Sequence, residues 1–362
     1  MKAARWFDIK DVRVVDIEKP EPKNDEVVIE VQGCGICGSD LHSYLADAGL
    51  IPIKEAHPVS KQKAPITMGH EYSGIVSEIG KDVTNLKVGD RVAVEPLYFC
   101  ESCQPCKEDF YNTCNTIGFQ GLSGDGAFSD YTKFKAKLVH KIPDTMSFDD
   151  GALVEPIAVA YHSLRKGQFK AGQTAIVSGA GTIGLSTIKC LKAMGASEIY
   201  VVQRKSIRQE YAKNEGCIVL DPNECDVVEQ IKKLTNGKMV DVAFETTGSQ
   251  QCYQLLLNSV RNQGMLVITS IWEHDIQVNL NDLVLTEKNV VGTICYNDND
   301  FADVIKLIGD KKLDTTGLIT KRIALDDIVE EGFGTLTGPD KKKHVKILVI
   351  PENSSIKDEI GK

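Results

Sequence analysis

A glycine triplet between a strand and a helix is the feature that most constrains the fold of this chain. The β-rich run Thr174–Ser178 ends directly before Gly179, Gly181 and Gly184, and a helical segment is expected from about residue 182 to residue 194. A G-x-G-x-x-G triplet alone also marks ordinary loops, but in this context it is typical of a βαβ unit that binds a dinucleotide. We therefore expect a doubly wound parallel sheet of the Rossmann type.

Each glycine of the triplet has a separate predicted role. Gly179 permits a tight turn, Gly181 lets a pyrophosphate approach the backbone, and Gly184 lets the helix and the strand pack closely. The phosphates are expected at the positive end of the helix, where the backbone N–H groups of Thr182 and Ile183 lie. The motif therefore predicts a dinucleotide cofactor.

The rest of the chain divides into two patterns. Four further apolar strand candidates alternate with helices, at 199–202, 240–244, 265–269 and 290–294. Such alternation indicates a parallel sheet with crossover helices. The first 150 residues instead carry short β-type runs separated by glycine, proline and aspartate, which predict an irregular, mostly β domain. Since 362 residues exceed one ordinary core, we expect a nucleotide-binding domain over 157–296 and a second domain over 1–156, completed by 297–362.

Composition limits the classes of partner. The formal net charge of −9 argues against nucleic acid, because a protein that binds the phosphate backbone needs a basic face. No apolar run approaches the ~20 residues that span a bilayer, and the N-terminal residues lack the apolar core of a signal peptide. The eleven cysteines favour metal ligands and buried thiols over disulfides. We therefore expect a cytoplasmic protein that binds neither nucleic acid nor a membrane.

Four cysteines lie close together in the sequence, at Cys100, Cys103, Cys106 and Cys114. Zinc favours four sulfur ligands in a tetrahedron, and a closed set of four thiolates leaves no coordination position for a substrate. The spacing therefore predicts a structural zinc ion that holds a protruding lobe.

The residues after the second strand of the predicted sheet should decide between the two nicotinamide cofactors. An aspartate or glutamate there hydrogen-bonds the adenosine ribose 2′-hydroxyl and repels a 2′-phosphate. This chain has the neutral Gln203, followed by Arg204, Lys205 and Arg208. Because a guanidinium can bind a phosphate through two parallel N–H bonds, the pattern favours NADP(H) over NAD(H). The alternative is a solvated, basic beginning of the next helix.

Candidates for a second, catalytic metal are scattered along the chain, at Cys37, His70, Glu71 and Glu155. A catalytic zinc keeps one coordination position open, but spacing alone does not establish a metal here, and a single histidine is more often a hydrogen-bonded structural residue. Cys34 and Cys37 form C-x2-C, a spacing that redox pairs also have. We interpret Cys34 as a buried small hydrophobe.

Taken together, these motifs resemble those of the zinc-dependent medium-chain alcohol dehydrogenases, and they occur in the same order. They are the run from Cys37 to His42, the segment from Gly69 to Glu71, the four cysteines and the glycine triplet. The likeness covers nearly the whole chain. It is strongest to the butanediol dehydrogenase (acetoin reductase) branch, beside sorbitol dehydrogenase, in the segments 1–6, 65–71, 152–156, 270–273 and 330–334.

This resemblance implies a GroES-like catalytic domain beside the Rossmann domain, and two zinc ions per chain, one catalytic and one structural. It implies that Cys37, His70 and Glu155 bind the catalytic zinc. Glu71 would then be an alternative ligand that can exchange with water.

The resemblance further implies that Ser39 receives the alcohol proton and that His42 passes it toward solvent. The segment from Glu245 to Gly248, which contains Thr246 and Thr247, follows a strand end where the family places cofactor contacts near the nicotinamide. Members of the family commonly form homodimers or homotetramers. The butanediol branch usually carries an acid at the position of Gln203 and uses NAD, so this chain departs from the branch at Gln203. Some members lack the structural-zinc cysteines, whereas this chain retains all four.

We therefore expect hydride exchange between a nicotinamide cofactor and a small secondary alcohol or hydroxyketone, in which zinc polarises the ketone oxygen or stabilises an alkoxide. The expected reaction is the reversible oxidation of butane-2,3-diol to acetoin. A sorbitol-type polyol dehydrogenase or another secondary-alcohol dehydrogenase is the main alternative, because it would share every zinc residue named above. A cofactor-binding structural protein without activity is a third interpretation, against which the intact ligands and relay argue.

Overall fold

Two compact units make up the computed structural model, which describes residues 1–361. The units consist of Met1–Glu155 with Asn297–Asp310 and Ile319–Lys362, and of Pro156–Tyr296 with Lys311–Leu318. Lys362, the last residue of the predicted catalytic domain, lies outside the described residues. The division between Glu155 and Pro156 falls inside helix α3 (Phe148–Lys166). Within residues 1–361, every helix is too short or too polar to cross a membrane.

Antiparallel sheets dominate the first unit. The largest has the strand order β10-β6-β5-β3-β18-β17, with β9 also paired to β3. The strands of this unit are β1 (Lys2–Asp8), β2 (Asp11–Asp16), β3 (Glu26–Gly35), β4 (Ile66–Thr67), β5 (Glu71–Ile79), β6 (Arg91–Val94), β7 (Leu97–Tyr98), β8 (Gly118–Phe119), β9 (Tyr131–Lys135), β10 (Val139–Lys141), β17 (Ile319–Ala324) and β18 (Lys346–Ile350). Its helices are α1 (Gly38–Leu45), α2 (Gln104–Lys107), α9 (Asp298–Gly309) and α10 (Thr335–Thr337).

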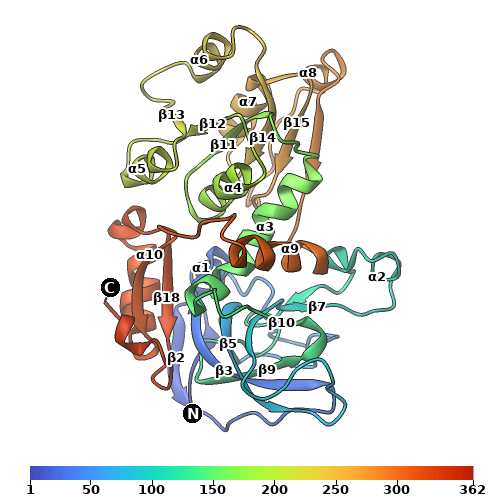
Figure 1. The fold of residues 1–362 in the computed structure, drawn as a ribbon, viewed down its shortest axis with the longest axis vertical. Helices are drawn as coiled ribbons and strands as arrows, with labels where there is room; N and C mark the ends of the chain where they lie inside the picture. The colour runs from blue at the N-terminus through green and yellow to red at the C-terminus, as the bar shows by residue number, and fades with distance from the viewer. Residues whose placement is uncertain (362) are drawn as a thin grey trace. The chain divides into compact units, whose positions relative to one another are not determined.

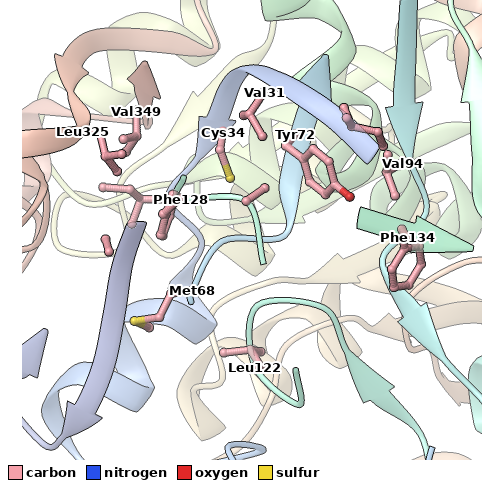
Figure 2. Close-up of a cluster of buried hydrophobic side chains, with 14 of the residues drawn as sticks. Val31, Cys34, Met68, Tyr72, Val94, Leu122, Phe128, Phe134, Leu325 and Val349 are labelled. Atoms are coloured by element: carbon pink, nitrogen blue, oxygen red, sulfur yellow. The ribbon is translucent and has the colours of Figure 1, made fainter. Parts of the chain in front are cut away.

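The core of the first unit forms around β3 and β5. Most residues of β3 are buried on both faces of the sheet, because the strand lies between β5 and β18. Figure 2 shows Val31 and Cys34 of β3 close to Tyr72 of β5, in a cluster that also includes Phe128. Cys34 is fully buried there, which confirms its interpretation as a small hydrophobe, and burial raises the pKa of its thiol.

The second unit contains a parallel sheet with the strand order β13-β12-β11-β14-β15-β16. Its strands are β11 (Thr174–Ser178), β12 (Glu198–Val202), β13 (Ile218–Leu220), β14 (Val240–Glu245), β15 (Val260–Ile268) and β16 (Asn289–Gly292). The helices that follow the strands are α4 (Thr182–Ala193), α5 (Ile207–Asn214), α6 (Val227–Leu234), α7 (Gln250–Ser259) and α8 (Asn281–Val284). Figure 1 shows α4 and α7 beside the strands. The order reverses between β11 and β14, as in a doubly wound Rossmann sheet, and the expected fold class is confirmed.

The short segment Lys311–Leu318 belongs to the second unit, whereas the sequence analysis placed it in the first domain. Hydrogen bonds from Thr316 lower the pKa of Asp314, and the charges of two lysines on α4 lower it further. Leu313 in the same segment is buried. The attraction between Asp314 and the lysines of α4 gives a physical reason why this segment belongs to the second unit. The segment is too short for an apolar periodicity that could have predicted this.

Candidate active site

A cluster of metal-binding donors lies in the first unit, where β3 pairs with β5. The donor atoms of Cys37, His70 and Glu71 lie within 4.8 Å of one another. Cys37 follows β3 and is the N-cap of α1, while His70 precedes β5, whose first residue is Glu71. Because Gly35 of β3 pairs with Glu71 in the antiparallel register, two segments far apart in the sequence meet at one point.

The two ring nitrogens of His70 face different groups. Nε2 lies 3.2 Å from Ser39 Oγ, and Nδ1 lies 3.7 Å from Asp40 Oδ1. Within the described residues, Nδ1 and Oδ1 are buried without a hydrogen-bond partner. A metal-binding histidine ordinarily presents one nitrogen to the ion and the other to a carboxylate or carbonyl. The ring is therefore oriented to bind a metal through Nε2.

The charges around His70 favour a cation. Burial by itself lowers the pKa of His70, but the negative charges of Asp40, Cys37 and Glu155 raise it to about 10. A divalent metal ion supplies positive charge at this place. Thiolate, imidazole and carboxylate are the groups with which proteins bind zinc, so the residues present fit a catalytic zinc ion.

Glu71 is paired with Lys346 of β18, a residue that the sequence analysis did not identify. Lys346 is 2% exposed, and its Nζ donates to a carboxylate oxygen of Glu71 and, at 2.9 Å, to the carbonyl oxygen of Ile36. Burial lowers the pKa of Lys346, but the charges of Glu71 and Cys37 raise it above the ordinary value. A Cβ at Gly35 would overlap the Glu71 carboxylate, so glycine leaves room for the pair. A lysine inside an otherwise apolar strand was the available signal.

Glu155 lies on α3 and is buried. It stands outside the group of three donors that lie within 4.8 Å of one another. Its negative charge nevertheless contributes to the raised pKa values of His70 and Lys346. Glu155 is therefore an electrostatic neighbour of the cluster.

The two residues predicted to carry the proton lie on α1. Ser39 is in the first turn of the helix, beside the ring nitrogen of His70. His42 lies in the last turn, its side chain is 41% exposed, and its Nε2 is 3.3 Å from Asp47 Oδ1. One helix therefore carries a hydroxyl beside the metal-donor cluster and a partly exposed imidazole at its other end.

The four predicted structural ligands also come together. The Sγ atoms of Cys100, Cys103, Cys106 and Cys114 all lie within 4.8 Å of one another. Cys103 Sγ is 3.4 Å from Cys106 Sγ and 3.8 Å from Cys114 Sγ, where a zinc tetrahedron with Zn–S bonds of ≈ 2.3 Å has edges of about 3.8 Å. Hydrogen bonds from Ser102 and from backbone N–H groups lower the pKa of Cys100 to about 5, which favours the thiolate that zinc binds.

The glycine turn of the second unit has the geometry that a phosphate-binding motif needs. Gly179 has φ +85°, a conformation that other residues rarely adopt. A Cβ at Gly184 would overlap the carbonyl oxygen of Gly179, so glycine allows α4 to pack closely on β11. Gly181 is the N-cap of α4 and contributes no side chain there. The N–H groups of a first helical turn, here at Thr182 and Ile183, are the usual partners of a phosphate.

The residues predicted to choose the cofactor surround this turn. The Oε1 atom of Gln203 accepts the backbone N–H of Ala180 at 2.8 Å. The guanidinium of Arg208 lies close to Gly181, since a Cβ on this glycine would be 3.4 Å from it. Burial lowers the pKa of Arg208. Arg204 and Lys205 are exposed. A neutral amide and three basic side chains therefore lie at this end of the sheet.

Thr246 and Thr247 follow β14, next to the glycine turn. A Cβ at Gly179 would lie 2.8 Å from Thr247 Cγ2. The fully buried carboxylate of Glu245 accepts hydrogen bonds from this turn. The sequence analysis placed Glu245 in a segment expected to contact the cofactor, but it did not predict that this acid is buried and bonded to the turn.

Known proteins resemble both units. Residues 23–144 match the alcohol dehydrogenase GroES-like domain family, and residues 182–310 match the zinc-binding dehydrogenase family. The chain is 45% identical over 353 residues to the (R,R)-butanediol dehydrogenase of Bacillus subtilis (strain 168), covering 97% of this chain and 100% of that protein. It is 34% identical over 354 residues to the sorbitol dehydrogenase of the same strain, covering 97% of each.

Solved structures share the fold. A crystal structure of 2R,3R-butanediol dehydrogenase from Bacillus subtilis has a TM-score of 0.91 at 45% identity, covering 97% of this chain and 99% of that one. A protein described as a zinc-binding dehydrogenase from Sinorhizobium meliloti 1021, solved with NADP bound, has a TM-score of 0.87 at 28% identity, covering 97% and 99%. The resemblance read from the sequence is confirmed, and the chain belongs to the zinc-dependent medium-chain alcohol dehydrogenases, which are oxidoreductases.

Proposed function

We propose that this chain catalyses the reversible oxidation of butane-2,3-diol to acetoin with a nicotinamide cofactor. The observation that carries the proposal is 45% identity along 97% of the chain to a relative named (R,R)-butanediol dehydrogenase, against 34% to the relative named sorbitol dehydrogenase. The clustered donors Cys37, His70 and Glu71, with Ser39 beside them, support a site for alcohol oxidation.

Cys37, His70 and Glu155 would hold the catalytic zinc, and the four clustered cysteines would hold a structural zinc, which makes two per chain. A zinc ion in the first site supplies a Lewis acid that lowers the pKa of a substrate hydroxyl. Glu71 would be the exchangeable ligand. The ion pair with Lys346 supports that role, because a carboxylate that leaves a metal needs a partner if it stays buried.

Ser39 and His42 would move the proton. A hydroxyl can donate and accept a hydrogen bond, so Ser39 Oγ can take the proton of the alcohol and pass on its own. His42 suits the outer end of the relay because an imidazole nitrogen can accept a proton and donate one, and its side chain is partly exposed. The position of Ser39 beside His70 Nε2 and the exposure of His42 support this order.

NADP(H) is the cofactor that the second unit would prefer over NAD(H). Gln203 brings no negative charge to the end of β12, and its amide oxygen is held by the backbone of the glycine turn. The exposed Arg204 and Lys205, together with Arg208, would bind a 2′-phosphate. A related structure was solved with NADP bound, which supports this proposal.

The cofactor proposal is tested by the rates of acetoin reduction with NADPH and with NADH. Arg204→Ala should lower kcat/KM for NADPH about tenfold, since a charge-assisted hydrogen bond contributes ≈ 1.5–3 kcal/mol, and should leave the rate with NADH nearly unchanged. Preference for NADH in the wild type, together with a silent Arg204→Ala, would reject the phosphate-binding role.

The substrate proposal is tested by the purified enzyme's kcat/KM for butane-2,3-diol, acetoin, sorbitol and threonine. We expect the four-carbon diol and acetoin to be preferred. A higher kcat/KM for sorbitol than for butanediol would establish the polyol dehydrogenase alternative instead. The second relative, at 34% identity, is the observation that keeps sorbitol in the panel.

Two copies of the chain would associate through β16. This strand lies at the edge of the parallel sheet, and an edge strand can pair with the same strand of a second copy around a two-fold axis. The segment that leads into it exposes large apolar side chains, Leu280, Val284 and Leu285. Leu285→Asp should convert the dimer or tetramer to a monomer in analytical ultracentrifugation. A monomeric wild type would contradict the proposal.

A cytoplasmic location is also proposed. The eleven cysteines support it, because none of them forms a disulfide in the described part of the chain.

A further inference from the structure

Glu245 is a fully buried carboxylate at the point where the strand order of the parallel sheet reverses. It is the last residue of β14 and pairs in register with Ser178, the last residue of β11. These strands are neighbours, although β12 and β13 come between them in the sequence. In doubly wound sheets, ligands bind beyond the carboxyl ends of the strands at this switch point. Glu245 therefore lies directly beneath the place where a dinucleotide is expected.

Five neutral donors surround this carboxylate. Oε1 accepts the N–H of Thr247 at 2.8 Å, the hydroxyl of Thr247, and the hydroxyl of Ser178 at 3.2 Å. Oε2 accepts the N–H of Gly248 at 3.1 Å and the hydroxyl of Ser270. Burying a charged carboxylate is costly unless both oxygens are hydrogen-bonded. The donors come from the ends of β11, β14 and β15, so the carboxylate ties three strand ends together.

Two further hydrogen bonds, from Thr246, hold the turn after β14 against the glycine turn that follows β11. The N–H of Thr246 lies 3.3 Å from Ser178 Oγ, and its hydroxyl donates to the carbonyl oxygen of Ser178. Thr247 Cγ2 lies 2.8 Å from where a Cβ on Gly179 would be. The turn and the first glycine of the motif are therefore packed together. A shift of the carboxylate would move a turn that borders the cofactor-binding motif.

We propose that Glu245 is a positioning residue for the turn that packs against Gly179, and through this turn for the pyrophosphate of the cofactor. The proposal rests on the proposed function, because it takes Thr246 and Thr247 as cofactor contacts. Glu245 is fully buried, so it acts through these two residues, which its hydrogen bonds fix at the switch point. The adenosine half meets a different set of groups, at Gln203 and Arg204, which hold no bond to Glu245.

Glu245→Gln tests the proposal because glutamine has nearly the same shape but cannot satisfy both backbone donors. Each carboxylate oxygen accepts one backbone N–H, so either orientation of the amide would place its NH₂ group against an N–H. The variant should raise the dissociation constant of the reduced cofactor about tenfold or more. The matching adenosine fragment, adenosine 2′-monophosphate for NADPH or adenosine for NADH, contains no pyrophosphate and should bind with a dissociation constant changed by less than about threefold. Calorimetric titration of both ligands into the purified enzyme measures the two effects.

Asp241 supplies a matched control on the same strand. It lies near the other end of β14 and accepts the N–H of Thr174 at 2.9 Å and the Nε–H of Arg261 at 2.8 Å. Asp241→Asn should lower the thermal midpoint and leave the ratio of the two ligand affinities unchanged. Ser270→Ala removes one hydroxyl donor from Glu245 and keeps both backbone donors. It should weaken binding of the reduced cofactor by a smaller factor than Glu245→Gln.

Equal weakening of both ligands in Glu245→Gln, or no change in either, would overturn the proposal. If Glu245→Gln does not fold, Ser270→Ala provides the same comparison: a loss confined to the reduced cofactor supports positioning, and equal losses or none reject it. Failure of the proposed function gives a different result, because the wild type would then bind the reduced cofactor but turn over neither butane-2,3-diol nor acetoin.

Discussion

In the second unit, the groups assigned to the cofactor follow β11, β12 and β14, so they lie together at the carboxyl ends of the strands of one parallel sheet. In the first unit, Cys37, His70 and Lys346 come from segments that meet only through strand pairing, since β3 lies between β5 and β18. Parallel strands place their carboxyl ends at a common edge whatever the details of register. Antiparallel strands bring chosen residues together only in the correct register.

This difference predicts different responses to substitution. The groups of the second unit make separate contacts with separate parts of a ligand, so single changes there should have graded effects. The first unit concentrates the charges of Cys37, Asp40, Glu71 and Lys346 in one buried place, where removing one group leaves another buried without its partner. The largest single-residue effects should therefore come from the first unit.

The largest expected effect is that of Cys37→Ala. The change removes a donor of the catalytic metal cluster, so turnover should fall by at least about a thousandfold. Zinc content should fall from two ions to one. Steady-state rates on butane-2,3-diol and elemental analysis measure both.

Cys34→Ala is the matched control for Cys37→Ala. Cys34 is a buried thiol three residues earlier, and it packs in the hydrophobic core rather than in the donor cluster. It should keep both zinc ions and most of the activity. Full turnover in Cys37→Ala would remove the cluster from the mechanism.

A smaller effect is expected from Cys106→Ser in the four-cysteine lobe. Structural zinc sites stabilise the fold around them, and a closed site does not meet the substrate. The variant should lose one zinc ion, become more sensitive to proteolysis within residues 100–114, and retain more turnover than Cys37→Ala. Equal loss of turnover in the two variants would show that the two metal sites of the first unit act as one.

Cys225→Ser is the control for the lobe variant, because Cys225 belongs to neither metal cluster. It should leave zinc content and protease sensitivity unchanged. A cleavage site that appears in both variants would indicate general destabilisation rather than loss of a bound metal.

The same contrast explains what could be predicted from the sequence. The glycine turn and the four cysteines are contiguous, so their spacing contains most of their geometry. The fold class followed from the strands and helices around the glycine turn. By contrast, the pairing of Glu71 with Lys346 joins residues 275 positions apart and depends on the order β5-β3-β18. No local pattern specifies that order.

Asp40 and Glu245 show a second limit of prediction. Both acids are completely buried in the structure. Each nevertheless occupies a position where a solvated acid is common. Asp40 is in the first turn of a helix and Glu245 is at a strand end. Their partners, His70 for the first and a turn of backbone N–H groups for the second, become visible only when the strands are placed. Burial of an acid is a tertiary property, and local sequence does not encode it.

The smallest expected effect concerns the pH dependence of stability in the second unit. Glu215 forms ion pairs of 2.6 Å with both Lys189 and Lys192, and Lys189 is buried. Burial by itself raises the pKa of Glu215, but hydrogen bonds from the two lysines lower it below the ordinary value of 4.5. A carboxyl whose pKa is lower in the folded than in the unfolded state adds stability above the unfolded pKa, and this stability is lost as the pH falls through the folded pKa.

Glu215→Gln should therefore lower the free energy of unfolding by about 1–2 kcal/mol at pH 7, because Lys189 stays buried with a weaker partner. The difference from the wild type should shrink as the pH falls below 4.5. Glu210→Gln breaks the exposed pair with Lys213 and should change little at any pH. Denaturant unfolding between pH 3 and pH 8, with zinc content measured alongside, tests this contrast. A loss of zinc in Glu215→Gln would mean that the stability of the second unit controls the metal cluster of the first. The two units would then not be independent.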